Sequence, residues 1–236
     1  MGRVIITCQT IKSEVGLAIQ ETGVDYPVLS VDSGLHDNPA LLRKAIQEQM
    51  DRIDNVDTIY MALGFCGNAL LGIKSVQARL IIPRADDCIS LLLGSYELRR
   101  QISAEAGTYF LTKGWLDGES NLLTEYERCV GKYGPERALK VMKTLMGHYR
   151  RLMVIDTKAY ALEDILNRTI AFAQKIGMKH AQFPGSLRFL KKLLLGPWDE
   201  EFIILEPGNE LAFDALCLDG SGGQPPYNQF LSAPAL

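Results

Sequence analysis

Short apolar runs rich in β-branched residues alternate along the chain with longer segments in which apolar residues recur at helical spacing. The short runs predict strands, and each of them stops at a cluster of polar or turn-forming residues. We expect these strands at residues 4–7, 28–31, 58–63, 79–82, 108–112, 152–155, 181–183 and 202–205. The run at 58–63 is apolar on both faces, which is typical of a parallel sheet covered by helices. The alternation therefore predicts parallel βαβ units.

The order of strands and helices repeats along the chain. The sequence Leu-Leu-Leu-Gly at 91–94, in a predicted helix that opens near residue 89, returns at 193–196, where another predicted helix ends. We therefore expect an α/β protein of two similar βα-repeat halves, residues 1–105 and 106–206, with mainly parallel sheets and a cleft between the halves. The alternative is that such echoes occur in any α/β chain. Residues 207–236, rich in Gly, Ser and Pro towards the end, are expected to form a flexible or surface-draped C-terminal extension.

Composition and charge narrow the class of protein. The chain is 47% hydrophobic and 22% charged, as globular proteins are, and its net charge is −3. So small a charge gives no electrostatic basis for binding nucleic acid or an anionic membrane. The apolar runs fall well short of the roughly 20 residues that span a bilayer. Because the sequence begins directly with a strand-like run and shows no signal peptide, we expect a cytoplasmic protein.

Three of the five cysteines follow directly on predicted strands. Cys8, Cys66 and Cys88 come after the first, third and fourth strands. Ligands of open parallel sheets bind outside the carboxyl ends of the strands, so we expect these thiols on one rim. Without an export signal the thiols are expected to be reduced. We therefore predict a three-cysteine metal site, holding zinc or an iron–sulfur cluster with one coordination position open.

Six further residues near the strand ends are candidate ligand-binding residues: His36, Gly67, Asn68, Arg84, Asp87 and Trp115. His36 would turn the site into a closed Cys₃His set, or it serves only to begin the following helix. Glycine beside Cys66 permits close approach of a ligand, and Asn68 offers an amide or forms a turn. Arg84 pairs with an anionic ligand or with a neighbouring Asp, and Asp87 caps the next helix or transfers a proton. Trp115 walls the site or packs in the core.

The thiols also have a purely structural interpretation. Free cysteine often acts as a small buried hydrophobic residue, and the chain has no CxxC pair of the kind that marks common zinc sites. For Cys129 and Cys217, which lie away from the strand ends, a structural role is the expectation. No nucleotide-binding or hydrolase motif is present either, and the pattern names no catalytic residue.

The motifs around these residues resemble a functionally uncharacterised family of anaerobic bacteria and methanogenic archaea. The resemblance is carried by residues 34–39, 63–68, 81–88, 91–95 and 106–115, and it extends through about residue 206. The family shows an Arg-x-His-Asp-Cys pattern, and Asp86 stands here at the position of its histidine. Members often occur near corrinoid-dependent methyltransferases, which implies a role in one-carbon metabolism.

Three functions compete at this point. The first is a metal- or iron–sulfur-binding protein that uses the three-cysteine site in corrinoid-linked methyl metabolism. The second is a non-catalytic accessory protein that binds a corrinoid or another small ligand for a methyltransferase system. The third is a structural protein whose cysteines are core residues. The expected partners are a small-molecule ligand and, by the resemblance, a corrinoid protein or methyltransferase.

Overall fold

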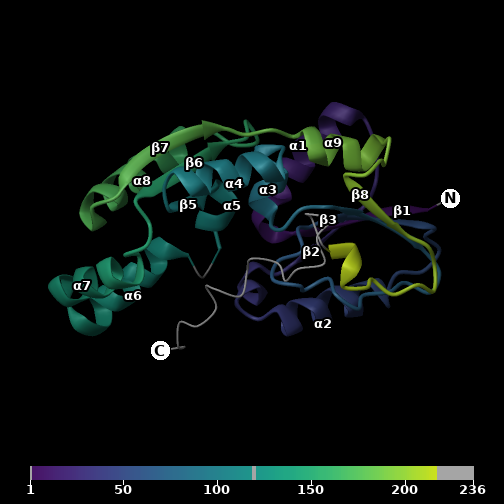
Figure 1. Ribbon diagram of the computed structural model, residues 1–236, viewed down its shortest axis with the longest axis horizontal. Helices are drawn as coiled ribbons and strands as arrows, with labels where there is room; N and C mark the ends of the chain where they lie inside the picture. The colour runs from purple at the N-terminus through teal and green to yellow at the C-terminus, as the bar shows by residue number, and fades with distance from the viewer. Residues whose placement is uncertain (1, 119–120, 217–236) are drawn as a thin grey trace.

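The computed structural model describes residues 2–118 and 121–216, which form two sheets flanked by helices (Figure 1). The first sheet has five strands in the order β2-β1-β3-β4-β8, and the second has three in the order β5-β6-β7. All pairs are parallel except β4 with β8. The predicted α/β class with mainly parallel sheets is therefore confirmed.

The strands lie where the apolar runs predict them. They are β1 (Arg3–Cys8), β2 (Val28–Val31), β3 (Thr58–Ala62), β4 (Arg79–Pro83), β5 (Thr108–Leu111), β6 (Arg151–Asp156), β7 (Lys179–Pro184) and β8 (Phe202–Leu205). The last strand comes from the predicted second half but pairs with β4 in the first sheet. The division at residues 105 and 206, and the internal duplication, stay predictions.

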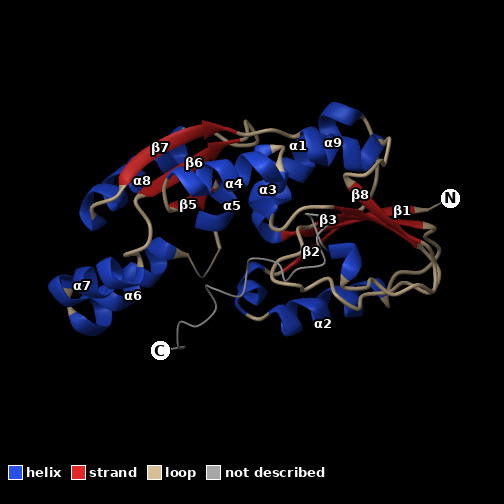
Figure 2. Ribbon diagram, viewed as in Figure 1, coloured by secondary structure: helices blue, strands red, loops and turns tan. Residues whose placement is uncertain are grey.

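Helices connect the strands and cover the sheets. They are α1 (Lys12–Thr22), α2 (Pro39–Met50), α3 (Cys88–Leu93), α4 (Tyr96–Glu105), α5 (Lys113–Leu116), α6 (Leu122–Tyr133), α7 (Pro135–Leu145), α8 (Glu163–Ile176) and α9 (Arg188–Leu195), with short 3₁₀ turns η1 (Gln9–Ile11), η2 (Ser33–Asp37) and η3 (Asp214–Leu216). Helix α2 covers one face of the first sheet, and α1 and α9 cover the other (Figure 2). Among the described helices, none combines the length and apolarity needed to cross a membrane.

The interiors of the strands are buried because helices cover both faces of the first sheet. Ile5, Ile6 and Leu80 are fully buried and belong to the larger of two hydrophobic clusters. The smaller cluster lies around β5 and β6 with α6, α7 and α8. Burial of such side chains, at roughly 1.5–3 kcal/mol each, is the main force that holds the strands in place. The buried core therefore holds the strands, and with them the strand ends, in place.

Several contacts join the residues before and after position 105, and two of them involve the segment that follows β1. Gly114 of α5 lies against η1, and an added Cβ at this position would stand 1.9 Å from the carbonyl oxygen of Thr10. Thr157, just after β6, donates a 2.9 Å hydrogen bond to the buried carboxyl group of Glu14 in α1. The second half is therefore fitted directly onto the segment that follows β1.

The predicted C-terminal extension is described only as far as residue 216. Its first part returns to the five-stranded half, where Leu211 is buried and exchanges backbone hydrogen bonds with Gly72 and Ile73. The remainder, residues 217–236 with Cys217, lies outside the described residues.

Candidate metal centre

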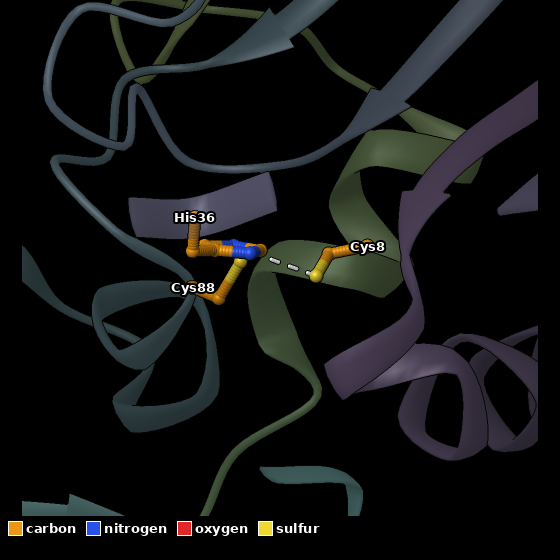
Figure 3. Close-up of side chains that lie close together, drawn as sticks. All are labelled: Cys8, His36 and Cys88. Atoms are coloured by element: carbon orange, nitrogen blue, oxygen red, sulfur yellow. Dashed lines mark hydrogen bonds between the residues drawn. The ribbon is translucent and has the colours of Figure 1, made fainter. Parts of the chain in front are cut away.

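The side chains of Cys8, His36 and Cys88 meet at the carboxyl edge of the first sheet (Figure 3). Cys8 is the last residue of β1, His36 lies in η2 just after β2, and Cys88 opens α3 after β4. One ligand atom from each residue lies within 4.8 Å of the other two. Both cysteines are buried and His36 is half-buried, so the three atoms face one another in the interior.

The orientation of His36 follows from its hydrogen bonds. The Asp32 side chain accepts a 2.7 Å bond from the backbone N–H of Gly34 and so begins the turn that carries His36. Nδ1 of His36 lies 2.9 Å from the carbonyl oxygen of Ser33. A carbonyl oxygen only accepts, so Nδ1 carries the proton and Nε2 is the acceptor nitrogen of the neutral ring. Nε2 points to the Cys8 sulfur at 3.5 Å.

The Cys8 sulfur has fixed hydrogen-bond partners of its own. The Thr10 hydroxyl lies 2.9 Å from it, and the backbone N–H of Thr10 donates to it at 3.4 Å. These donors stabilise a thiolate by hydrogen bonding, although in the protein without metal a hydrogen bond with Cys88 and burial raise the pKa of the Cys8 thiol. A hydrogen bond with Cys66 and burial likewise raise the pKa of Cys88. Both thiols are therefore protonated at neutral pH, and a cation that binds them has to displace their protons.

Cys66 lies beside this group but outside the set of three. Its backbone N–H donates to the carbonyl oxygen of Asp86 at 2.8 Å, so the loop after β3 runs alongside the segment before α3. Gly64 makes this contact possible, because an added Cβ would stand 2.4 Å from the carbonyl carbon of Asp87. Cys66 is half-buried and adopts a left-handed conformation with φ of 45°. Its predicted role as a metal ligand stays a prediction.

The structure places the other candidate residues around the same edge. Asp87 caps α3 through a 2.9 Å bond from the Ser90 N–H, and its other oxygen lies 3.3 Å from Arg99. Arg84 donates to the carbonyl oxygen of Ala215 at 2.7 Å. Through these contacts Asp87 and Arg84 stabilise the local structure. A part in ligand binding stays a prediction for both residues.

The remaining candidate residues lie in the loop after β3 and at Trp115. Asn68 follows Gly67 in a left-handed turn, with φ of 69° and 66°, and its carbonyl oxygen accepts from Arg43 at 3.1 Å. Trp115 packs edge-on against the His36 ring, with the ring centroids 5.4 Å apart. Trp115 therefore contacts the group of three through His36, and its predicted part in ligand binding stays a prediction.

Sequence reasoning missed two residues, Thr10 and Ser33, that hydrogen-bond to the grouped side chains. Thr10 and Ser33 act on Cys8 and His36 through single hydrogen bonds, and neither residue type is distinctive in a turn. Asp86 is half-buried two residues before Cys88, and burial together with the charge of Asp87 raises the pKa of its carboxyl group to about 6. The Ser90 hydroxyl donates to this carboxyl group. The sequence did single out Asp86, as the departure from the family pattern.

An open pocket of about 400 Å³ lies between the segment that follows β1 and the segment that follows β5. It is lined by Gln9, Lys12, Ser13, Gly114, Asp117 and Gly118. Gln9 directly follows Cys8, and Gly114 directly precedes Trp115, so the pocket is formed by sequence neighbours of the metal centre. Its volume falls in the range of small-molecule sites.

Comparison with known proteins places the chain in a family. A sequence model described as "Protein of unknown function (DUF1638)" matches residues 30–194, and the chain belongs to this family. The matched segment contains His36, Cys66 and Cys88, whereas Cys8 precedes it. Neither the curated proteins nor the solved structures include a significant match. The link to corrinoids and methyltransferases stays a prediction.

Proposed function

We propose that this member of the family binds a transition-metal ion, zinc foremost, through the sulfurs of Cys8 and Cys88 and Nε2 of His36. The observation that carries the proposal is the hydrogen bond from Nδ1 of His36 to the Ser33 carbonyl. Metal-ligating histidines are held in this way by a backbone or carboxylate acceptor, which turns the other nitrogen towards the ion. Here that nitrogen faces two buried sulfurs.

The donor set favours zinc. Two thiolates and an imidazole are ligands that zinc prefers, and tetrahedral zinc with three protein ligands keeps one position for substrate. Zinc in such a position acts as a Lewis acid and makes a bound thiol nucleophilic. Iron–sulfur clusters are held chiefly by three or four thiolates, so a set of two sulfurs and one imidazole favours a cluster less.

The reaction class we propose is methyl or one-carbon transfer to or from sulfur. A zinc-bound thiolate is a suitable methyl acceptor, and the resemblance to a family found near corrinoid-dependent methyltransferases supports this choice. The alternative is an accessory protein that binds a corrinoid or another small ligand without catalysis. The pocket of about 400 Å³ supports a small ligand better than a macrocycle.

Metal analysis of anaerobically purified protein tests the proposal. After loading with zinc and removal of excess metal, we expect one zinc ion per chain and a colourless protein. His36→Ala should lower zinc affinity more than about 100-fold, since even outer residues of zinc sites contribute 10–100-fold. His148→Ala is the matched control, because His148 is exposed and lies far along the chain from the centre. Equal zinc retention by both variants would contradict the proposed role of His36 as a metal ligand. A brown protein with stoichiometric iron would show that the site holds an iron–sulfur cluster rather than zinc.

A further inference from the structure

We infer that Cys66 is a fourth, exchangeable ligand of the proposed zinc site, and that the molecule which displaces it is a small thiol. The inference rests on the proposed function, because it needs an ion held by Cys8, His36 and Cys88. It assigns a role to the cysteine that lies against this group without belonging to it.

The first argument is the position of Cys66. Two backbone hydrogen bonds of 2.8 Å, from Phe65 to Ala85 and from Cys66 to Asp86, hold the loop after β3 against the segment that leads to Cys88. The Cys66 side chain is near enough to interact with the Cys88 thiol, and this interaction raises the pKa of Cys88. Two thiolates on a tetrahedral zinc ion stand roughly 3.8 Å apart, given a zinc–sulfur distance of about 2.3 Å. Cys66 is therefore a thiol beside the group of three that can supply a fourth ligand, once its sulfur shifts towards the group.

The second argument is the difference in burial among the four ligands. Cys8 is 0% exposed and Cys88 is 2% exposed, and His36 is anchored to Ser33. Cys66 is half-buried, and its sulfur is not within 4.8 Å of all three other ligand atoms. Of the four ligands, Cys66 is thus the one that an incoming molecule from solvent can reach and displace. Cys8, His36 and Cys88 hold the metal ion while Cys66 is detached.

The third argument is the backbone around Cys66. Cys66, Gly67 and Asn68 are successive left-handed residues, with φ of 45°, 66° and 69°. Residues other than glycine rarely adopt this conformation, and where they do the surroundings enforce it. Here Arg43 donates to the Asn68 carbonyl oxygen at the end of the turn. Cys66 therefore lies in a short loop rather than in a helix or strand, which suits a ligand that detaches and returns.

The chemistry of exchange selects a thiol. Three thiolates and an imidazole saturate tetrahedral zinc, so an incoming molecule must displace one of them. Water competes poorly with a thiolate held beside the ion, whereas another thiol competes on equal terms because its donor atom is the same. The zinc–sulfur bond to Cys66 breaks and one to the incoming thiol forms, while the proton of that thiol moves to the Cys66 sulfur. The exchange changes neither the net charge nor any oxidation state.

Zinc-edge X-ray absorption spectroscopy on the full-length protein counts the ligands. For the wild-type protein we expect three sulfurs and one nitrogen around zinc, and for Cys66→Ser two sulfurs with zinc still bound. Cys129→Ser is the control, because Cys129 packs against the smaller hydrophobic cluster and should leave three sulfurs. A wild-type count of two sulfurs overturns the role of Cys66 alone. A wild-type protein that holds no zinc overturns the metal site itself.

A selenol probe then tests the exchange. After addition of 2-hydroxyethaneselenol under argon, zinc in the wild-type protein should lose one sulfur neighbour and gain one selenium neighbour. In Cys66→Ser the selenium should appear without loss of sulfur. A wild-type centre that keeps three sulfurs and gains no selenium shows that Cys66 is a permanent ligand and overturns the inference. Loss of zinc from Cys66→Ser overturns it as well.

Discussion

The carboxyl edges of the two sheets are built alike but carry different chemistry. At the first edge, the segments after β1, β2 and β4 bring two thiols and an imidazole together in the interior. At the second edge, Thr112 after β5 caps α5, and Asp156 at the end of β6 pairs with Lys158. Both edges are parallel-sheet rims of the kind where ligands bind. The side chains at the strand ends therefore decide where the chemistry lies.

The comparison also shows what the second edge contributes. Trp115 packs against His36, Gly114 lies against Thr10, and Thr157 bonds Glu14. Each contact runs from the second half to a ligand or to the segment that follows β1. The first half supplies the three grouped side chains, and the second contacts His36 and the segment that follows β1.

The largest effect is expected from removing a ligand at the first edge. Cys88→Ser should lower zinc affinity more than about 100-fold, because it removes a buried thiolate from the proposed three-ligand set. Competition with a chromogenic chelator measures the affinity, and circular dichroism checks the fold. Cys129→Ser, a thiol of the second half, should bind zinc as the wild type does. Similar losses of zinc affinity in Cys88→Ser and Cys129→Ser would contradict the claim that the metal-binding chemistry lies at the first edge.

The fit between the halves is tested by Gly114→Ala. The new Cβ would overlap the Thr10 carbonyl oxygen, so we expect the free energy of unfolding to fall by about 1–3 kcal/mol or more. Gly131→Ala is the control, because Gly131 lies in α6 with open space around the added Cβ, and it should gain about 0.5–1 kcal/mol. Urea unfolding measures both values. A neutral Gly114→Ala would show that the halves do not depend on this contact.

The support of His36 by the second half is tested at Trp115. Trp115→Ala should weaken zinc binding roughly tenfold, the lower end for residues that orient a metal ligand. Trp115→Phe should bind nearly as tightly, because the ring is kept and the buried indole N–H has no hydrogen-bond partner among the described residues. If both variants bind as the wild type does, Trp115 does not orient His36.

The smallest effect concerns the pH dependence of the Glu14 contact. Burial raises the pKa of Glu14, so its contribution to stability is complete below its unfolded pKa and is lost as pH rises through the folded pKa. Gln cannot ionise and still accepts from Thr157. The stability of Glu14→Gln relative to the wild type should therefore increase with pH, by an amount on the order of 1 kcal/mol. Urea unfolding between pH 4 and pH 8 gives the difference, and one that does not vary with pH would contradict this account of Glu14.

Much of the fold follows from local pattern, whereas the site depends on tertiary detail. The apolar runs locate β1 to β8, and the strand-end rule places Cys8 and Cys88 on one rim. The pattern did not reveal α4, whose face is largely polar, or the antiparallel pairing of β8, which depends on where the chain returns.

The histidine and the third cysteine show the limit most clearly. His36 faces the sulfurs only because the turn after β2 aims its Nδ1 at the Ser33 carbonyl, and no residue pattern encodes that direction. Cys66 stands outside the set of three, in a loop with a left-handed path that non-glycine residues rarely adopt. The first feature comes from a local hydrogen bond within one turn, and the second lies in a loop held by a contact between Cys66 and Asp86, which are distant in sequence.

Anomalous diffraction from crystals of the zinc-loaded protein at the zinc edge tests the central claim most directly. The account predicts one strong peak at the carboxyl edge of the first sheet, about 2.3 Å from the sulfurs of Cys8 and Cys88 and about 2.0–2.1 Å from Nε2 of His36. Absence of a peak there, or a peak only at another part of the molecule, would contradict it.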